Sequence, residues 1–239
     1  MSTLLLRLAG PLQAWGTESR FNTRQTGTLP SKSGVIGLLS AALGLRRDAD
    51  LSNLRKLRFG VRTDHAGELL RDYHMVHYLK TADVTNRYYL SDAVFLAGLE
   101  SDDVTLLETL ENALKFPVWP LYLGRRACPP TLPLVLGIRE LPLDEALRQE
   151  PWQLSLWQQE QWQRRHPNES PELSIMTDAD GLGYGRAIVQ DDPISFDQRN
   201  RQHGFRAVEG KTAVTILLNS EISESVATEH DAFAEVEGS

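Results

Sequence analysis

Hydrophobic positions in the first 140 residues follow two spacings in turn, one typical of strands and one typical of helices. Four apolar or alternating runs predict strands, over Thr3–Ala9, Leu57–Thr63, Ala93–Leu99 and Leu132–Ile138. Two segments with helical spacing lie between them, Gly34–Leu45 and Asp102–Lys115. The predicted order is therefore strand, helix, strand, insertion, strand, helix, strand.

The ends of the two predicted helices carry the residues that helix ends favour. Ser31 or Ser33 can cap the first helix by accepting a hydrogen bond from its free N–H groups. Gly44 follows its last apolar turn and predicts its end. Acidic residues stand at the start of the second helix, where the helix dipole favours negative charge.

Residues 64–90 interrupt this pattern with a polar stretch rich in histidine and tyrosine. We expect a hairpin that projects from the sheet as an insertion. The order of the remaining elements is that of an α+β, ferredoxin-like domain, the frame of RNA-recognition-motif domains among others. Many unrelated functions use this frame, so the pattern predicts a fold without naming an activity.

The pattern changes after residue 140, and we predict a smaller, mostly β region over residues 141–220. It begins with a short helix at Leu143–Gln149, followed by a segment with three tryptophans. Three short strands are expected later, at Ala187–Val189, Ile194–Phe196 and Arg206–Val208. Residues 221–239 are acidic, with no Lys or Arg, and predict a mobile tail.

Cysteine content and hydropathy limit the setting of the protein. Cys128 is the single cysteine among 239 residues, which excludes an intramolecular disulfide and a cysteine-based metal site. The longest uncharged apolar-rich stretch, Ser33–Leu45, is shorter than the roughly 20 residues that span a membrane. The opening leucines follow no basic residue, and Arg7 interrupts them, which is unlike a signal peptide. We expect a cytoplasmic protein without membrane contact.

The charge is distributed unevenly along the chain, although its formal net value is −7. Residues 1–62 contain ten Lys/Arg against three Asp/Glu, and the remaining 177 residues contain 15 against 29. Such a split indicates one surface for a polyanion and another for solubility or protein partners. Arginines scattered over solvated faces would give the same count, so charge by itself leaves both interpretations open.

The segment from Gly27 to Ser33 has part of the character of a phosphate-binding loop. It is one residue short of the P-loop pattern, lacks the glycine before Lys32, and no acidic strand for magnesium follows. An NTPase is therefore not expected, and no cofactor is implied. A lysine and free N–H groups at a helix N-terminus would still suit a phosphate.

The histidines of the insertion raise two further possibilities. His74 and His77 have the spacing of a zinc pair, but no third ligand stands at a familiar distance, so no metal site is predicted. A metal-independent ribonuclease needs a base, an acid and a cation. Residues of these types fall within eight positions: Tyr73, His74, His77, Tyr78 and Lys80. The same residue types bind RNA without cleaving it, which leaves both readings open.

Three blocks of sequence resemble a known family. The first runs through Leu6–Gly16, Thr23–Gly27 and Pro30–Leu39, the second is Arg71–His74, and the third is Pro120–Pro129. Their order and separation resemble the CasD family, RAMP-superfamily subunits of the type I-E CRISPR Cascade complex. Asp192–Phe196 is also similar to the family. The resemblance covers roughly residues 3–210.

The resemblance implies a non-catalytic subunit that caps the 5′ handle of the CRISPR RNA, in antiviral defence. Its expected neighbours are the backbone subunit and the large subunit of the complex, with target DNA met indirectly. It also implies that residues 64–90 form a thumb on a ferredoxin-like domain spanning residues 1–140. A repeat-cleaving endoribonuclease remains the alternative, because RAMP relatives elsewhere cleave precursor RNA.

Single-stranded RNA is held by phosphate contacts and base stacking, which selects the candidate binding residues. The phosphate candidates are Arg24, Lys32, Arg125 and Arg126; the stacking candidates are Trp15, Tyr73 and Tyr122; the hydrogen-bond candidates are Gln13 and His74. Trp15 and Tyr122 fit a hydrophobic core equally well. Gly10, Gly16 and Gly124 are expected to let backbone approach RNA.

Overall fold

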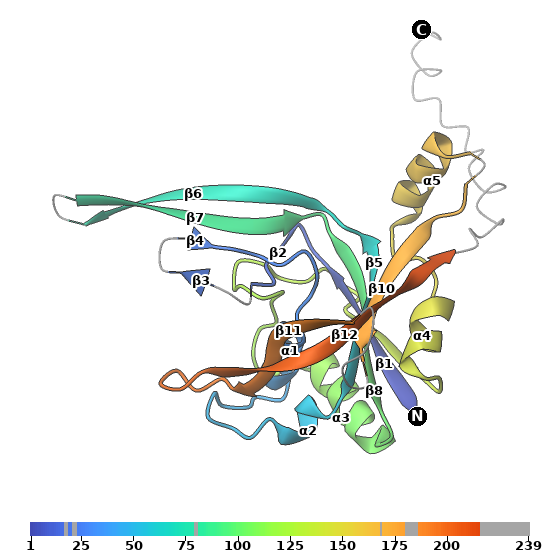
Figure 1. The fold of residues 1–239 in the computed structure, drawn as a ribbon, viewed down its shortest axis with the longest axis horizontal. Coiled ribbons are helices and arrows are strands. Elements are labelled where there is room, and N and C mark those ends of the chain that lie inside the picture. The colour runs from blue at the N-terminus through green and yellow to red at the C-terminus, as the bar shows by residue number, and fades with distance from the viewer. Residues whose placement is uncertain (17–18, 21–22, 79–80, 168, 180–185, 216–239) are drawn as a thin grey trace, which may run out of the picture.

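The computed structural model describes residues 1–16, 19–20, 23–78, 81–167, 169–179 and 186–215. Within these ranges, seven strands form one antiparallel sheet in the order β11-β12-β10-β5-β8-β1-β9 (Figure 1). Their bounds are β1 Ser2–Ala9, β5 Arg58–His65, β8 Val94–Ser101, β9 Val135–Arg139, β10 Glu172–Asp178, β11 Arg186–Ser195 and β12 Gln202–Thr215. The protein is therefore a mixed α+β fold built on this sheet.

The sheet is covered on both faces, which explains the apolar run of β1. Leu4, Leu6 and Leu8 pack in a core with helices α1 (Lys32–Ala42) and α3 (Val104–Lys115). Leu5 points to the other face and packs in a second core with α4 (Leu143–Gln149). Successive side chains on a strand point to opposite faces, so a strand buried on both faces loses its polar positions.

The helix signals predict the helix ends closely. Ser31 caps α1, and its side chain accepts a hydrogen bond from the backbone N–H of Gly34. Asp103 caps α3 in the same way through Leu106 N–H. The helix α4 has the bounds expected for it, and two further helices are α2 (Ser52–Arg55) and α5 (Leu156–Arg165). Neither these nor any other helix of the described residues has the length and apolar character to cross a bilayer.

The C-terminal strands differ from the expectation. Strand β10 was not predicted, and it joins the edge of β5 through Ile175–Thr177. Two of the expected short strands, Ala187–Val189 and Ile194–Phe196, belong largely to the single strand β11, which is irregular between Val189 and Asp192. Polar residues at this irregularity divide the apolar positions into two runs, so the sequence predicted two strands. One of these polar residues, Asp191, is buried and forms an ion pair with Arg206.

Residues 64–90 contain a long hairpin that projects from the body of the molecule (Figure 1). Its strands are β6 (Glu68–Tyr78) and β7 (Thr81–Ser91), paired without a register shift from Glu68↔Ser91 to Tyr78↔Thr81. The segment between β1 and α1 contributes three short strands beside it, β2 (Leu12–Gln13), β3 (Ser19–Arg20) and β4 (Thr23–Arg24). The expected acidic tail, 221–239, lies outside the described residues.

Candidate nucleic-acid interface

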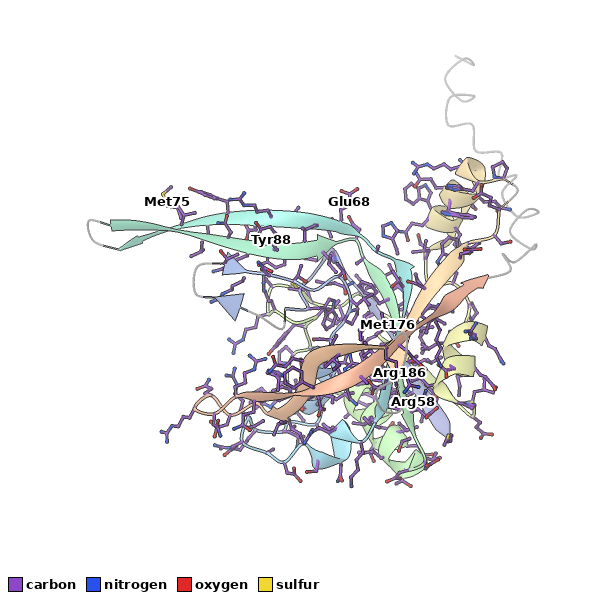
Figure 2. All side chains as sticks on the ribbon, viewed as in Figure 1. Arg58, Glu68, Met75, Tyr88, Met176 and Arg186 are labelled. Atoms are coloured by element: carbon purple, nitrogen blue, oxygen red, sulfur yellow. The ribbon has the colours of Figure 1, made fainter. Side chains whose placement is uncertain are left out.

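One face of the hairpin combines exposed apolar side chains with an arginine. Directly opposed residues share a face of a β-ribbon, and the faces alternate along each strand. The register therefore puts Leu69, Arg71, Tyr73, Met75 and Val84 on one face. Tyr73 is 55% exposed, and Arg71 donates a hydrogen bond from Nε to Asn86 Oδ1 at 2.9 Å. Figure 2 shows Met75 toward the tip and Tyr88 nearer the body. This face suits stacking on an unpaired base.

The opposite face of the hairpin is charged. The same register puts Asp72, His74, Arg87 and Tyr89 together on it. His74 Nε2 hydrogen-bonds to the Asp72 carboxylate. The sequence placed Tyr73 and His74 together in one candidate RNA site. In the structure their side chains lie on opposite faces of the hairpin. His77 and Tyr78 have no described side chains, and Lys80 lies outside the described residues.

Strand β4 pairs in parallel with β7 on the side away from β6. This pairing makes Arg24 the direct register partner of Arg87. Register partners in a sheet project to the same face, so two arginines lie on one face near the middle of the hairpin. Neither arginine takes part in an ion pair among the described residues, and Arg87 Nε is buried without a hydrogen-bond partner.

Arg125 connects the hairpin to β4 from a third segment of the chain. Its Nη1 donates to Tyr88 O at 3.1 Å, and its Nη2 donates to Arg24 O at 2.9 Å and to Gln25 O at 3.1 Å. The guanidinium also lies over the Tyr89 ring, 4.7 Å from the centroid. All three acceptors are neutral carbonyls, so the positive charge of Arg125 is not cancelled by them.

Gly124 fixes the backbone of the Arg125 loop. It has a φ of +85°, and a Cβ atom there would lie 1.7 Å from the Ala14 carbonyl oxygen. A Cβ atom on Gly10 would likewise meet Pro129 O at 2.9 Å. These two glycines therefore allow two segments of backbone to approach each other closely. This packing explains why glycine stands at both positions without invoking contact with RNA.

Gln13 and Trp15 lie in the interior. Gln13 Nε2 donates to Leu8 O at 3.1 Å and to Ala93 O at 2.7 Å. Its Oε1 accepts a hydrogen bond from Trp15 Nε1 at 2.9 Å, and the Trp15 side chain is 2% exposed. Both residues hold the loop after β1 against the sheet, and neither presents a surface to a ligand in this structure.

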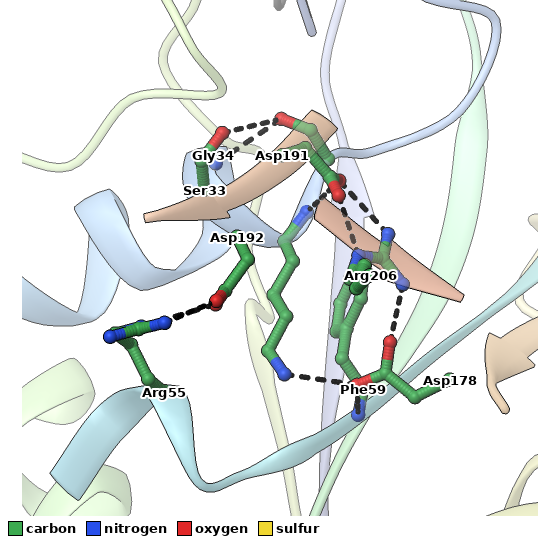
Figure 3. A network of polar contacts seen from close by, with 10 residues as sticks. Ser33, Gly34, Arg55, Phe59, Asp178, Asp191, Asp192 and Arg206 are labelled. Carbon is green, nitrogen blue, oxygen red and sulfur yellow. Dashed lines mark hydrogen bonds and ion pairs between the residues drawn. The ribbon is translucent and has the colours of Figure 1, made fainter. Parts of the chain in front are cut away.

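Lys32 also makes its contacts inside the protein, in a polar network with Asp178 and Asp191, which are labelled in Figure 3. Its ammonium is buried and lies 2.9 Å from Asp178 Oδ2, and its backbone N–H donates to Asp191 Oδ2 at 2.8 Å. The N-terminus of α1, expected to suit a phosphate, already holds the Asp191 carboxylate. Arg206 joins the same network through Asp191 and Asp178. Burial lowers the pKa of Arg206, but the two carboxylates outweigh burial and raise it overall.

The structure thus divides the nine candidate residues. Arg24, Tyr73, His74 and Arg126 are exposed, Tyr122 and Arg125 are partly buried, and Gln13, Trp15 and Lys32 are buried. Sequence reasoning missed Arg87, because a lone arginine in a polar hairpin carries no distinguishing signal. Arg87 becomes the register partner of Arg24 only when residues 63 positions apart in the sequence pair in the fold.

Residues 3–209 match the family described as CRISPR-associated protein (Cas_Cas5), and the chain belongs to this family. A curated relative, the CRISPR system Cascade subunit CasD of Escherichia coli (strain K12), is 42% identical over 159 residues. That alignment covers 57% of this chain and 70% of the relative.

Two solved structures have a similar fold over most of their length. A chain described as a CRISPR RNA-guided surveillance complex matches with a TM-score of 0.73 at 31% identity, over 89% of this chain and 91% of that chain. A crystal structure of a Cas protein matches with a TM-score of 0.68 at 41% identity, over 89% of this chain and 95% of that chain.

Proposed function

We propose that the chain is a non-catalytic RNA-binding subunit of a type I-E CRISPR surveillance complex, Cascade, and that it holds the 5′ handle of the CRISPR RNA. The observation that carries the proposal is the arginine cluster where β4, β7 and the Arg125 loop meet. Like charges in register repel each other, and a polyanion would relieve that repulsion. Family membership supplies the class of polyanion, because the Escherichia coli relative is named a Cascade subunit.

The proposed architecture is a ferredoxin-like frame within residues 1–140 that carries residues 64–90 as a thumb, with a smaller region over 141–220. Two observations support it. Elements β1, α1, β5, β8, α3 and β9 follow one another in the ferredoxin-like order, and their strands are arranged β5-β8-β1-β9. The hairpin starts and ends on neighbouring strands of this frame, β5 and β8, as an insertion requires.

A non-catalytic role fits the hairpin better than a ribonuclease does. The described members of the ribonuclease set, Tyr73 and His74, are on opposite faces, and His74 already contacts Asp72. A general acid and base must both reach the scissile group, which this arrangement does not favour. The backbone subunit and the large subunit are the proposed protein neighbours, with target DNA met through the complex in the cytoplasm.

RNA retention tests the proposal. The full chain would be assembled with its partner subunits and the host's CRISPR RNA, then washed with increasing salt. Charge reversal at exposed Arg24 and Arg126 should release the RNA at lower salt, whereas reversal at exposed Arg199, on the β11–β12 turn, should not. If the wild type, the Arg24/Arg126 variant and the Arg199 variant all retain the RNA equally, the chain would instead be a scaffold that contacts only protein subunits.

A second experiment separates binding from cleavage. The purified chain would be incubated with labelled repeat RNA in EDTA, which chelates metal ions and so inactivates contaminating metal-dependent nucleases. We expect intact RNA. Specific cleavage that is lost in His74→Ala would overturn the non-catalytic assignment and support the endoribonuclease alternative.

A further inference from the structure

We infer that Arg87 and Arg24 together form a seat for one phosphate diester of single-stranded RNA, at the junction of β7 and β4. The inference rests on the proposed function and assigns it a particular contact. It adds Arg87, which no sequence motif indicates. It also gives Arg125 a separate role as a positioning residue.

The strand pairing places two arginines on one face of the sheet. Strand β4 is only two residues long, and its parallel pairing with β7 makes Arg24 the register partner of Arg87. Two positive side chains on the same face of neighbouring strands repel each other, and the repulsion is greatest where water is partly excluded. An anion between them turns this unfavourable pair into two charge-assisted hydrogen-bonding groups, which is how arginines commonly bind phosphate.

Arg87 also carries an unsatisfied donor. Its Nε is buried and has no hydrogen-bond partner, although Asp72 is its register partner on β6. No ion pair joins Asp72 to Arg87 in the described part of the chain, and Asp72 instead contacts His74. A buried donor without an acceptor is costly, so an arginine left in this state points to an acceptor that arrives with a ligand.

Strand β4 is also held in place by Arg125, which lies outside its own short pairing with β7. Arg125 donates to the carbonyls of Arg24 and Gln25 and, from its other nitrogen, to Tyr88 on β7. Its guanidinium covers Tyr89, which lies on the same face of the hairpin as Arg87. Arg125 therefore fixes the separation of the two seat residues and adds a positive charge beside them.

The occupant is RNA and not an acidic protein segment, on the evidence of the surroundings. The seat lies near the middle of a hairpin whose opposite face exposes Tyr73 beside Arg71, a combination that stacks on bases. An RNA backbone that wraps around the hairpin at this point would meet the phosphate seat on one face and this stacking surface on the other.

A salt series with matched variants tests the seat. Binding of the full chain to a synthetic single-stranded RNA of the host repeat would be measured for wild type, Arg87→Gln and Arg47→Gln. Arg47 is an exposed arginine in the loop after α1 and controls for the loss of one distant charge. We expect Arg87→Gln to bind about tenfold more weakly and to lower the slope of log affinity against log salt by about 0.7. Arg47→Gln should change neither.

Neutralising single phosphates of the RNA locates the contact. One methylphosphonate position should weaken wild-type binding about tenfold and weaken Arg87→Gln binding clearly less, since one of the two arginine contacts is already lost there. If Arg87→Gln keeps the wild-type affinity and slope, or changes only as Arg47→Gln does, the seat does not exist. Weak, repeat-independent binding by the wild type would instead count against the proposed function, so the two failures are distinguishable.

Discussion

Arg62 and Asp64 form a two-point ion pair in which both side chains are fully buried. Arg62 Nε lies 2.7 Å from Asp64 Oδ1, and its Nη2 lies 2.8 Å from Oδ2. The remaining donors of Arg62 reach the carbonyls of Leu147, Glu150 and Pro151. The end of β5, where the hairpin begins, is thereby tied to the last turn of α4 and to the residues that follow it.

We predict that Arg62→Met destabilises the protein by about 3–5 kcal/mol, because it leaves the Asp64 carboxylate buried and unpaired. Chemical denaturation measures the change in the free energy of unfolding. Replacing both partners in Arg62→Met/Asp64→Leu should recover part of the loss, since no buried charge remains. A double variant as unstable as Arg62→Met would show that the carbonyl contacts matter more than the charge pair.

Arg125→Lys should weaken RNA binding without changing its salt dependence. Lysine keeps the positive charge, but a single ammonium cannot reach Tyr88 O, Arg24 O and Gln25 O as the planar fork does. Hydrogen exchange should become faster at residues 23–26 and 86–90, and the slope of log affinity against log salt should stay at the wild-type value. A lower slope would identify Arg125 as a phosphate contact.

Lys32→Met should lower stability and leave the salt dependence of RNA binding unchanged. The ammonium of Lys32 is buried against Asp178, so its removal costs about 1–3 kcal/mol through the lost charge-assisted hydrogen bond. Asp178 keeps its contacts with Arg206 and with Phe59 N–H, which limits the damage. Thermal unfolding and the RNA salt series are the two measurements. If the slope of log affinity against log salt fell by about 0.7 instead, Lys32 would be a phosphate contact after all.

Acidification should destabilise the β11–β12 region through His203. Burial, followed by the charge of Arg201, lowers the pKa of His203 below its ordinary value. Arg201 Nε lies 3.1 Å from His203 Nε2 and needs a neutral ring as acceptor. The unfolded chain therefore binds this proton more readily, and the stability due to the neutral ring is lost as the pH falls through the unfolded pKa.

The free energy of unfolding, measured in urea between about pH 7.5 and about pH 5.5, should fall less steeply for His203→Gln than for the wild type. His74→Gln is the matched control, because His74 is exposed on the hairpin. If the free energy of unfolding falls equally with pH in the wild type and in His203→Gln, then His203 does not cause the loss of stability in acid.

Local signals predicted much of the frame. The leucines of β1, the Ser31 cap and the α4 segment are set by neighbours within a few residues, and the sequence pattern records such neighbours. Strand β10 escaped prediction because its alternation is short and is interrupted by Thr177, a polar residue at a buried position, while its pairing partners lie on β5 and β12.

The candidate site was harder to predict, because its contacts join distant parts of the chain. Lys32 has the residue type and position of a phosphate ligand, yet its partners Asp178 and Asp191 are 146 and 159 residues away. Arg125 likewise finds its acceptors about a hundred residues earlier. Whether a charge faces solvent or a buried partner depends on such pairings, which the sequence pattern does not contain.

The pairing of β10 with β5 also bears on how the chain is made. Residues 1–140 leave the ribosome first, and at that moment the outer edge of β5 has no neighbour. Arg62, on this strand, still lacks its acceptors at Leu147, Glu150 and Pro151. An open strand edge is prone to wrong pairing. The nascent chain thus passes through a vulnerable interval that ends only when residues near 177 emerge, so pausing within residues 140–175 would promote aggregation.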